Sequence, residues 1–333
     1  TVLYPEGRQI PDDAIERRIF GPEARVVRRT KKALAELDAA DCAEADGLMI
    51  MRHAVSAEDL ARFARLRVIV RMGVGYDRLD RAAAAARNIL VCNVPDYGTT
   101  EVADHAMALA LALRRAVILY YEKQRATPPA PWRTLDDPLL RRLGSLAFGI
   151  IGIGRIGTAV ALRAKAFGCR VIGYDPYQPN GVERGLGIER ARTLDELLRQ
   201  ADILSVHAPL TAETRRMLGY DQLALLPKGA VVVNTARGGI IDIDALERLL
   251  RAGHIAGAGL DVLPDEPPVE PLPALLRAYR EREKWAEGRL IITPHAAFHS
   301  PESWEDIRVK SAETMRAALL GPRAQNVITP EMV

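Results

Sequence analysis

Short apolar stretches alternate with helical stretches along most of the chain, and this alternation constrains the fold more than any other feature. In the first hundred residues we expect strands at 1–4, 25–29, 47–51, 67–72 and 89–94. We expect helices between them, notably at 31–37, 56–66 and 79–88. Short apolar strands that alternate with helices of this length indicate a parallel sheet covered on both faces.

A second series of the same kind follows a long helical stretch and a proline-rich segment. The stretch 100–119 predicts a helix with a wide apolar face, buried between domains or between subunits, and 126–138 predicts a linker or an arm. The expected strands of this series are 146–152, 169–175, 203–209, 230–236, 256–262 and 290–295. Helices are expected at 158–168, 244–253 and 301–321. The fold class is therefore α/β, with two doubly wound parallel-sheet domains.

Composition excludes several classes of protein. The length of 333 residues suits two domains, and no apolar run approaches the roughly 18 residues of a membrane span. The net charge of +3, without a basic block among aromatic residues, argues against nucleic acid as a partner. Residues 1–7 read as a strand and turn and not as a signal peptide, and the three cysteines are scattered. We therefore expect a cytoplasmic protein without a metal site.

The segment 152-GIGRIG-157 lies between an expected strand and an expected helix. In this context Gly152 permits a tight turn, Gly154 lets the backbone approach a pyrophosphate, and Gly157 lets the helix pack on the strand. Asp175 ends the next strand, where an acid accepts hydrogen bonds from a ribose and repels a 2′-phosphate. A glycine turn alone is common, but the full set predicts a dinucleotide site that prefers NAD to NADP.

Three polar residues follow other apolar strands of the second series. Arg237 follows 230–236, Glu266 lies in the loop after 256–262, and His295 ends 290–295. Taken singly, each has an ordinary explanation as a surface arginine, a solvated acid or a structural histidine. Because the carboxyl ends of parallel strands share one edge, we expect the three to meet. A guanidinium that binds a carboxylate, beside an acid-braced imidazole, suits protonation of a carbonyl oxygen as hydride reaches its carbon.

The first series contains a second anion-site candidate at 71-RMGVGYD-77. It is either a plain glycine turn or a nest of backbone N–H groups for a carboxylate. His53 follows the preceding strand and is a possible substrate contact.

These motifs together identify a resemblance. The chain resembles the D-isomer-specific 2-hydroxyacid dehydrogenases over nearly its whole length, and within them the branch of the C-terminal-binding proteins. The motifs that carry the family resemblance are 71–80, 93–109, 149–157, 207–214, 234–242, 261–267 and 293–297. Those that carry the branch are 162–177, 180–187 and 293–300.

The resemblance implies a domain layout and an oligomer. A flavodoxin-like substrate domain would comprise residues 1–95 and 299–333, and a Rossmann-type NAD-binding domain would comprise 96–298, with the active-site cleft between them. The family also implies a homodimer through the NAD-binding domains, which would bury helix 100–119 and an arm at 126–140.

The resemblance also assigns roles. Arg237 would bind the substrate carboxylate and polarise the carbonyl, His295 would be the acid/base, and Glu266 would tune it. Expected substrate contacts are the N–H groups of Val74 and Gly75 and the side chains of His53, Tyr76 and Phe298. The remaining expected cofactor contacts are Arg155, Ile156, His207, Ala208, Pro209, Thr235, Ala236, Asp261 and Val102.

The predicted function is NAD(H)-dependent interconversion of a 2-keto acid and a D-2-hydroxy acid. One alternative is an NAD(H)-sensing dimeric scaffold, like the corepressors of the resembling branch, with vestigial turnover. Another is a Rossmann hydrolase that retains NAD. The segment 274–288 predicts an extra amphipathic helix that rims the cleft, with Trp285 on its apolar face.

Overall fold

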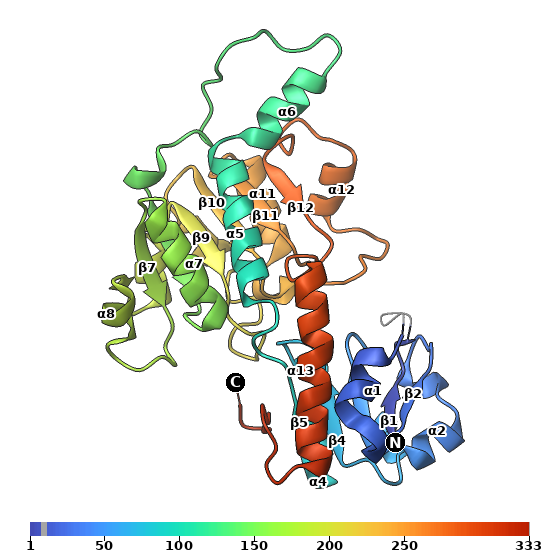
Figure 1. Ribbon diagram of the computed structural model, residues 1–333. Helices are drawn as coiled ribbons and strands as arrows, with labels where there is room; N and C mark the ends of the chain where they lie inside the picture. Colours follow the sequence, from blue (N-terminus) through green and yellow to red (C-terminus); the bar gives the residue numbers. More distant parts are fainter. Residues whose placement is uncertain (8–11, 333) are drawn as a thin grey trace. The chain divides into compact units, whose positions relative to one another are not determined.

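The structure is a computed structural model that describes residues 1–7 and 12–332. The chain forms two compact units (Figure 1). The first comprises Thr1–Gly98 and His299–Val333, and the second comprises Thr99–Phe298.

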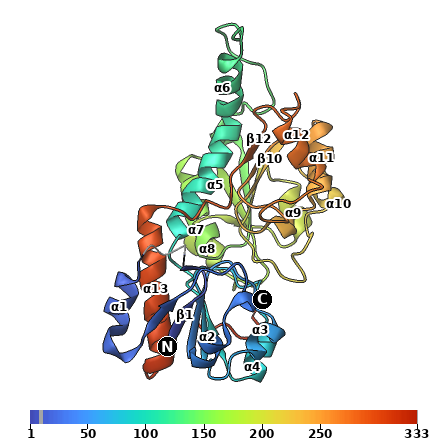
Figure 2. The ribbon, with the colours of Figure 1, turned by 90° about the vertical axis from the view of Figure 1, so that its right-hand side faces the viewer.

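The first unit is built on a five-stranded sheet in the order β2-β1-β3-β4-β5, in which every pairing is parallel. Its strands are β1 (Val2–Tyr4), β2 (Val26–Arg28), β3 (Gly47–Ile50), β4 (Val68–Arg71) and β5 (Leu90–Cys92). Helices α1 (Ala14–Phe20) and α13 (Pro301–Leu320) lie on one face, and α3 (Ala57–Ala61) and α4 (Arg81–Ala86) on the other (Figure 2). Helix α2 spans Ala39–Glu44. This strand order is that of flavodoxin-like folds, as predicted.

The second unit is built on a seven-stranded parallel sheet in the order β12-β11-β10-β9-β6-β7-β8. Its strands are β6 (Ala147–Ile151), β7 (Arg170–Tyr174), β8 (Glu189–Arg190), β9 (Ile203–Val206), β10 (Ala230–Asn234), β11 (Ile255–Leu260) and β12 (Leu290–Ile292). The order reverses between β6 and β9, which creates the topological switch point where ligands bind in open α/β sheets. The doubly wound prediction for this half is confirmed.

Helices cover both faces of this sheet (Figure 2). One face carries α5 (Thr99–Arg114) and α7 (Arg155–Ala166), and the other carries α9 (Leu194–Leu198), α10 (Tyr220–Ala224), α11 (Ile243–Arg251) and α12 (Ala274–Arg280). Helices α6 (Val117–Arg125) and α8 (Val182–Leu186) complete the unit. A buried apolar core lies on each side of the sheet.

Two helix predictions for the first unit are wrong in extent. Only a 3-10 turn, Leu34–Glu36, forms within 31–37, and the α-helix begins later, at Ala39. Lys31 and Lys32 stand where the helix dipole disfavours positive charge. The helix expected at 56–66 ends at Ala61, although Ser56 does form the capping box that its sequence favours.

The long helix predicted at 100–119 is interrupted. Ala116 has a left-handed φ of 50°, and α6 starts at Val117. The end of α5 is anchored by Arg114, whose buried guanidinium donates to the carbonyls of Gly229 and Asp202. We predicted that the apolar face of α5 would be buried between domains or between subunits. It packs on β10 and β11 of its own unit.

The glycines of β11 explain this packing. A Cβ on Gly259 would lie 2.9 Å from Leu109, and one on Gly257 would lie 2.9 Å from Leu113. Because both positions lack a side chain, the leucines of α5 can approach the strand closely.

Of the predicted helix 274–288, only α12, Ala274–Arg280, forms, and the end of the segment does not rim the site. Leu275 of α12 is buried in the core beneath α11. The guanidinium of Arg251 lies over the ring of Trp285, 4.9 Å from the ring centroid, and the indole N–H of Trp285 donates to Glu283. Arg251 ends α11 just before β11 begins, so this part of the segment lies at the amino edge of the sheet, opposite the edge where ligands bind.

Candidate active site

The glycine loop after β6 has the geometry of a dinucleotide cradle. Gly152 has φ of 88°, and a Cβ there would lie 2.8 Å from the backbone of His207 and Ala208. A Cβ on Gly157 would lie 1.9 Å from the carbonyl oxygen of Gly152, so no larger residue fits. A Cβ on Gly154 would meet only open space. The first and third glycines are thus required by the fold, and the second leaves room for a ligand.

The start of α7 supplies the polar groups of this cradle. The helix begins at Arg155, and its N-cap, Gly154, makes no side-chain capping bond. The first amides of a helix have no partner within the helix, and their positive dipole end attracts phosphate. Arg155 and Ile156 contribute two of these amides. The chain therefore fits a pyrophosphate at the place that the sequence predicts.

Asp175 directly follows β7 and is bound to the glycine loop. Its Oδ2 accepts from the N–H of Ile153 at 2.8 Å, and its Oδ1 accepts from the N–H of Tyr177 at 3.0 Å. Arg190 donates to the carbonyls of Asp175 and Gln178, at 3.1 and 2.8 Å. These bonds fix the acid beside the cradle.

His207 follows β9 on the other side of the cradle. Its Nε2 lies 2.8 Å from the hydroxyl of Ser205. Loss of hydration lowers the pKa of His207 to about 3, so the ring is neutral at physiological pH. Ala208 is buried, and Pro209 is exposed.

The three predicted catalytic side chains come together in the second unit. The Nδ1 of His295 lies 2.6 Å from the Oε2 of Glu266, and the Oε1 of Glu266 accepts from the N–H of Leu263 at 3.0 Å. Burial alone would raise the pKa of Glu266, but hydrogen bonds from His295 and Leu263, with the charges of His295 and Arg237, lower it. Glu266 is therefore a carboxylate at neutral pH. The ring of Phe298 meets the His295 ring edge-on, with centroids 6.3 Å apart.

A residue that the sequence analysis missed holds the turn that carries Arg237. Asn234 is only 1% exposed at the end of β10. Its Oδ1 accepts from the N–H of Ala236 at 3.0 Å, and its Nδ2 donates to the carbonyl of Arg237 at 2.9 Å. The guanidinium of Arg237 donates to the carbonyl of Ala236 at 2.7 Å. A carboxamide that ends a fully apolar strand is the sequence signal for this brace.

Gly238 brings the loop of Glu266 against the loop of Arg237. A Cβ on Gly238 would lie 2.0 Å from the carbonyl carbon of Leu263 and 2.4 Å from the nitrogen of Pro264. Gly238 is therefore needed for the close contact between its own backbone and that of Leu263, which lies three residues before Glu266.

Asp261 secures the loop that carries His295. It is 1% exposed, and its carboxylate accepts from the hydroxyl of Thr293 at 2.6 Å and from the N–H groups of Ala296 and Ala297, both at 2.9 Å. This loop holds His295 at φ of 53°, a left-handed conformation that is costly for a side chain other than glycine. Asp261 thus stabilises a strained backbone at a candidate catalytic residue. His105, 3.0 Å from the Thr293 hydroxyl, extends this network.

The remaining predicted cofactor residues line the same unit. Val102 is buried in the first turn of α5, and Ala236 is partly buried after β10. Thr235 is 8% exposed, and its buried hydroxyl makes no hydrogen bond within the protein. An unsatisfied buried hydroxyl of this kind needs a further partner.

The substrate residues expected near the N-terminus lie in the first unit, after β3 and β4. Val74 is 36% exposed, and Gly75 is partly buried. Tyr76 packs against the core, with Arg81 4.8 Å from its ring centroid. The Nδ1 of His53 is buried without a hydrogen-bond partner. Within the described residues, no group of His, Cys, Asp or Glu is arranged to hold a metal ion.

Comparison with known proteins identifies the family. The profile of the D-isomer specific 2-hydroxyacid dehydrogenase NAD-binding domain matches residues 107–297, more than half of the chain. The chain belongs to this family. It is 37% identical to D-3-phosphoglycerate dehydrogenase of Methanocaldococcus jannaschii over 82% of its own length, but spans only 49% of that relative. It is also 37% identical to glyoxylate reductase of Korarchaeum cryptofilum, over 84% of this chain and 81% of the relative.

Solved structures of the family share the fold. D-lactate dehydrogenase from Aquifex aeolicus, complexed with NAD and lactic acid, is 29% identical, with a TM-score of 0.80 over 95% of both chains. The NADPH-dependent glyoxylate/hydroxypyruvate reductase from Sinorhizobium meliloti, in complex with NADP and malonate, is also 29% identical, with a TM-score of 0.80. That match covers 98% of this family member and 96% of the reductase.

Proposed function

We propose that this family member is an oxidoreductase that interconverts a 2-keto acid and a D-2-hydroxy acid with NAD(H). The observation that carries the proposal is the His295–Glu266 pair, at 2.6 Å, close enough to Arg237 for its charge to lower the pKa of Glu266. This set lies in a sheet that also carries a dinucleotide cradle. The four relatives described above are dehydrogenases or reductases by name, which supports the same class of reaction.

Each side chain has a distinct part in the proposed reaction. When bound, NAD(H) supplies or accepts the hydride. Because Nδ1 of His295 is bonded to Glu266, Nε2 is the nitrogen that donates a proton to the carbonyl oxygen during reduction. The Glu266 carboxylate orients the ring and stabilises its protonated form. Arg237 binds the substrate carboxylate and polarises the carbonyl, since a guanidinium matches a carboxylate in bidentate fashion.

A screen of 2-keto acids with NADH oxidation as the readout tests this function. Glyoxylate, hydroxypyruvate, branched and aromatic keto acids should include at least one good substrate. His295→Gln should then abolish turnover while NADH still binds, and Arg237→Lys should lose most of kcat/KM because a point charge cannot replace the guanidinium fork. A protein that binds NADH but reduces none of these acids would overturn the proposal and favour the scaffold alternative. The comparisons give that alternative no support.

We also propose a preference for NAD over NADP. The carboxylate of Asp175 beside the cradle would repel a 2′-phosphate. A second carboxylate, Glu213 in the loop after β9, would add to this repulsion. It accepts from the hydroxyl of Tyr177, two residues after Asp175, and this bond holds its charge near the cradle. Relatives with each cofactor exist, so the comparison of NADH with NADPH as substrates is the test.

We infer that the second unit is the NAD-binding domain and the first the substrate domain. The family profile lies within the second unit. The first unit carries the Val74–Gly75 loop, which has the backbone groups to bind a carboxylate. We further propose a cytoplasmic location, because the three cysteines are buried and free. None of the helices in residues 1–7 and 12–332 is apolar and long enough to cross a membrane.

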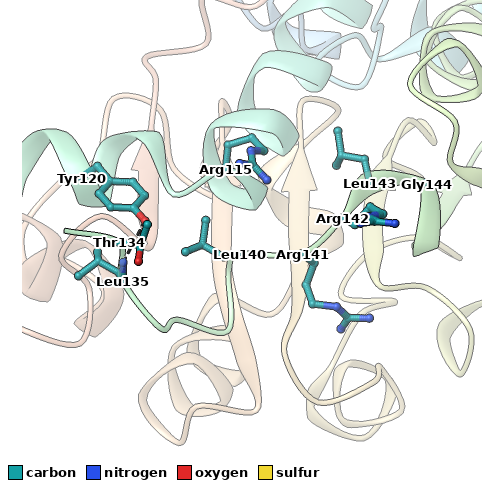
Figure 3. Close-up of a pocket in the computed structure, with 9 residues that line it drawn as sticks. All are labelled: Arg115, Tyr120, Thr134, Leu135, Leu140, Arg141, Arg142, Leu143 and Gly144. Carbon is teal, nitrogen blue, oxygen red and sulfur yellow. Dashed lines mark hydrogen bonds between the residues drawn. The ribbon is translucent and has the colours of Figure 1, made fainter.

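The surface of the second unit supports the proposed homodimer. Helix α6 and the segment after it extend away from the sheet (Figure 1). Trp132 in this segment is 93% exposed, and Tyr121 on α6 is 54% exposed. Beside them lies an open hollow of about 710 Å³ (Figure 3). Its lining combines apolar side chains with three arginines: Tyr120, Leu140, Leu143, Arg115, Arg141 and Arg142. Exposed aromatic side chains next to a hollow lined by apolar and arginine side chains are typical of protein interfaces. Light scattering with Trp132→Ser, expected to weaken the dimer, tests this.

A further inference from the structure

Asn93 is a buried carboxamide whose partner lies in the candidate carboxylate-binding loop. It follows β5 in the first unit and is 5% exposed. Its Nδ2 donates to the carbonyl oxygen of Val74 at 2.7 Å. The bond joins residues 19 apart in sequence, so it determines how the loop after β4 sits on the sheet edge.

The geometry of a trans peptide gives this bond a consequence for Gly75. The carbonyl of Val74 and the N–H of Gly75 belong to one planar peptide unit and point in opposite directions. Because the Val74 carbonyl is turned toward the buried Asn93 amide, the Gly75 N–H is turned the other way. Val74 is 36% exposed, so this peptide lies at the surface of the unit. An anion outside can accept from that N–H.

The neighbouring backbone is held as well. The N–H of Val94 donates to the carbonyl of Gly73 at 3.0 Å, and the N–H of Asn93 donates to the carbonyl of Asn326 at 3.1 Å. Gly73 has φ of 140°, which suits glycine, and the guanidinium of Arg71 fills the place of a Cβ there. The chain before the 74–75 peptide and the chain after Asn93 are thus both anchored, and the Asn93 side chain orients the peptide between them.

We propose that Asn93 is a positioning residue for substrate binding, which holds the Val74–Gly75 peptide so that the Gly75 N–H binds the carboxylate of a 2-keto acid. The inference rests on the proposed function, because it supposes that this loop meets the substrate carboxylate. A hydrogen bond between an N–H and a carboxylate is stronger than one between neutral groups. If the Gly75 N–H no longer points at the carboxylate, substrate binding should weaken about 10- to 100-fold.

The test compares steady-state kinetics of Asn93→Asp with the wild type. The aspartate keeps the shape but has no N–H to donate, and its charge opposes the Val74 carbonyl. KM for the keto acid, and the inhibition constant of the unreactive analogue oxamate, should rise about 10- to 100-fold. We expect kcat to change by only a few-fold, and the Kd of NADH from fluorescence titration to stay unchanged. Asn93→Ser, which also cannot reach Val74, serves if the aspartate variant does not fold.

A matched control is Thr314→Val in the same unit. Thr314 is 4% exposed and accepts from the side chain of Asn326 at 3.3 Å, so its loss weakens another partly buried hydrogen bond of this unit without touching Val74. This variant should lower Tm and leave KM unchanged. If the Asn93 variants change Tm alone, as Thr314→Val does, or reduce kcat and NADH affinity alike, the proposal is overturned. A wild type that reduces no keto acid would instead defeat the proposed function itself.

Discussion

The two glycines after Arg237 should respond very differently to the same substitution. A Cβ on Gly238 would lie 2.0 Å from the carbonyl carbon of Leu263 and 2.2 Å from its oxygen. These are backbone atoms, which cannot rotate aside. Ordinary contact begins at about 3.4 Å, so in Gly238→Ala the chain at Leu263 must retreat by roughly 1.4 Å.

This displacement falls on a segment that holds the candidate catalytic pair. The N–H of Leu263 donates to Glu266 at 3.0 Å, and Glu266 lies 2.6 Å from His295. A shift of about 1 Å in a catalytic group is enough to reduce a rate about 100-fold. We therefore expect Gly238→Ala to lower kcat/KM by about 100-fold and the free energy of unfolding by about 1–3 kcal/mol.

Gly239→Ala is the matched control. A Cβ on Gly239 would lie 3.3 Å from the end of the Leu210 side chain, which can move by the small amount required. This variant should keep kcat/KM within about threefold of the wild type, since no catalytic group is displaced. Keto-acid reduction followed by NADH absorbance, with Tm from thermal denaturation, measures both variants. Equal loss in the two, or a Gly238→Ala enzyme of normal activity, would refute the link between this contact and Glu266.

Three other predictions concern the cofactor, pH and stability. Asp175→Asn should raise the ratio of NADPH to NADH kcat/KM at least about tenfold, because the charge that repels a 2′-phosphate is gone; an unchanged ratio would place discrimination elsewhere. The pKa of His207 is lowered to about 3, so below its unfolded value of about 6.5 the unfolded chain binds a proton that the folded chain does not. The free energy of unfolding should therefore decrease as the pH is lowered from about 6.5 toward 3, by up to about 1.4 kcal/mol per pH unit. Urea denaturation of His207→Asn at the same pH values should show a smaller decrease. Finally, Arg308→Leu should cost about 3–5 kcal/mol because it strands Glu16, fully buried and 2.7 Å away, whereas the double variant with Glu16→Leu should recover most of that loss.

The sheets and the glycine loop were predictable because their sequence signals have few other solutions. An apolar run bounded by turn residues has little choice but a buried strand, and Gly157 admits one interpretation once a strand precedes it and a helix follows. Arg237 and His295 were predictable for a related reason. Each follows such a strand, and parallel strands bring their carboxyl ends to one edge.

The helix limits were not predictable in the same way. The break at Ala116 depends on Arg114, whose buried guanidinium reaches carbonyls at Asp202 and Gly229. Those partners are distant in sequence, so no local sequence pattern predicts where the helix ends. The position of 274–288 was mispredicted for a similar reason, since amphipathicity shows that one face is buried but not against which element.

The sequence did not predict a positioning role for three polar residues at strand ends, Asn93, Asn234 and Asp261. A polar residue at a strand end is equally consistent with an exposed and a buried side chain. The structure shows all three buried, each accepting from or donating to the backbone of a functional loop. Burial makes these bonds strong and makes their loss costly, because a stranded polar group has no water to replace its partner. A strand that is apolar throughout and ends in a carboxamide or carboxylate is therefore worth testing as a loop brace.

The contacts between neighbouring loops explain how residues far apart in sequence hold one catalytic geometry. Gly238, next to Arg237, packs on Leu263, and Leu263 donates to Glu266. Glu266 contacts His295, and Asp261 binds the loop of His295 from beneath. Each loop is thus positioned by the next one along the sheet edge, and no single loop needs to be rigid by itself. Substitutions at two of these contacts should therefore be non-additive, because the first already frees the loops that the second would release.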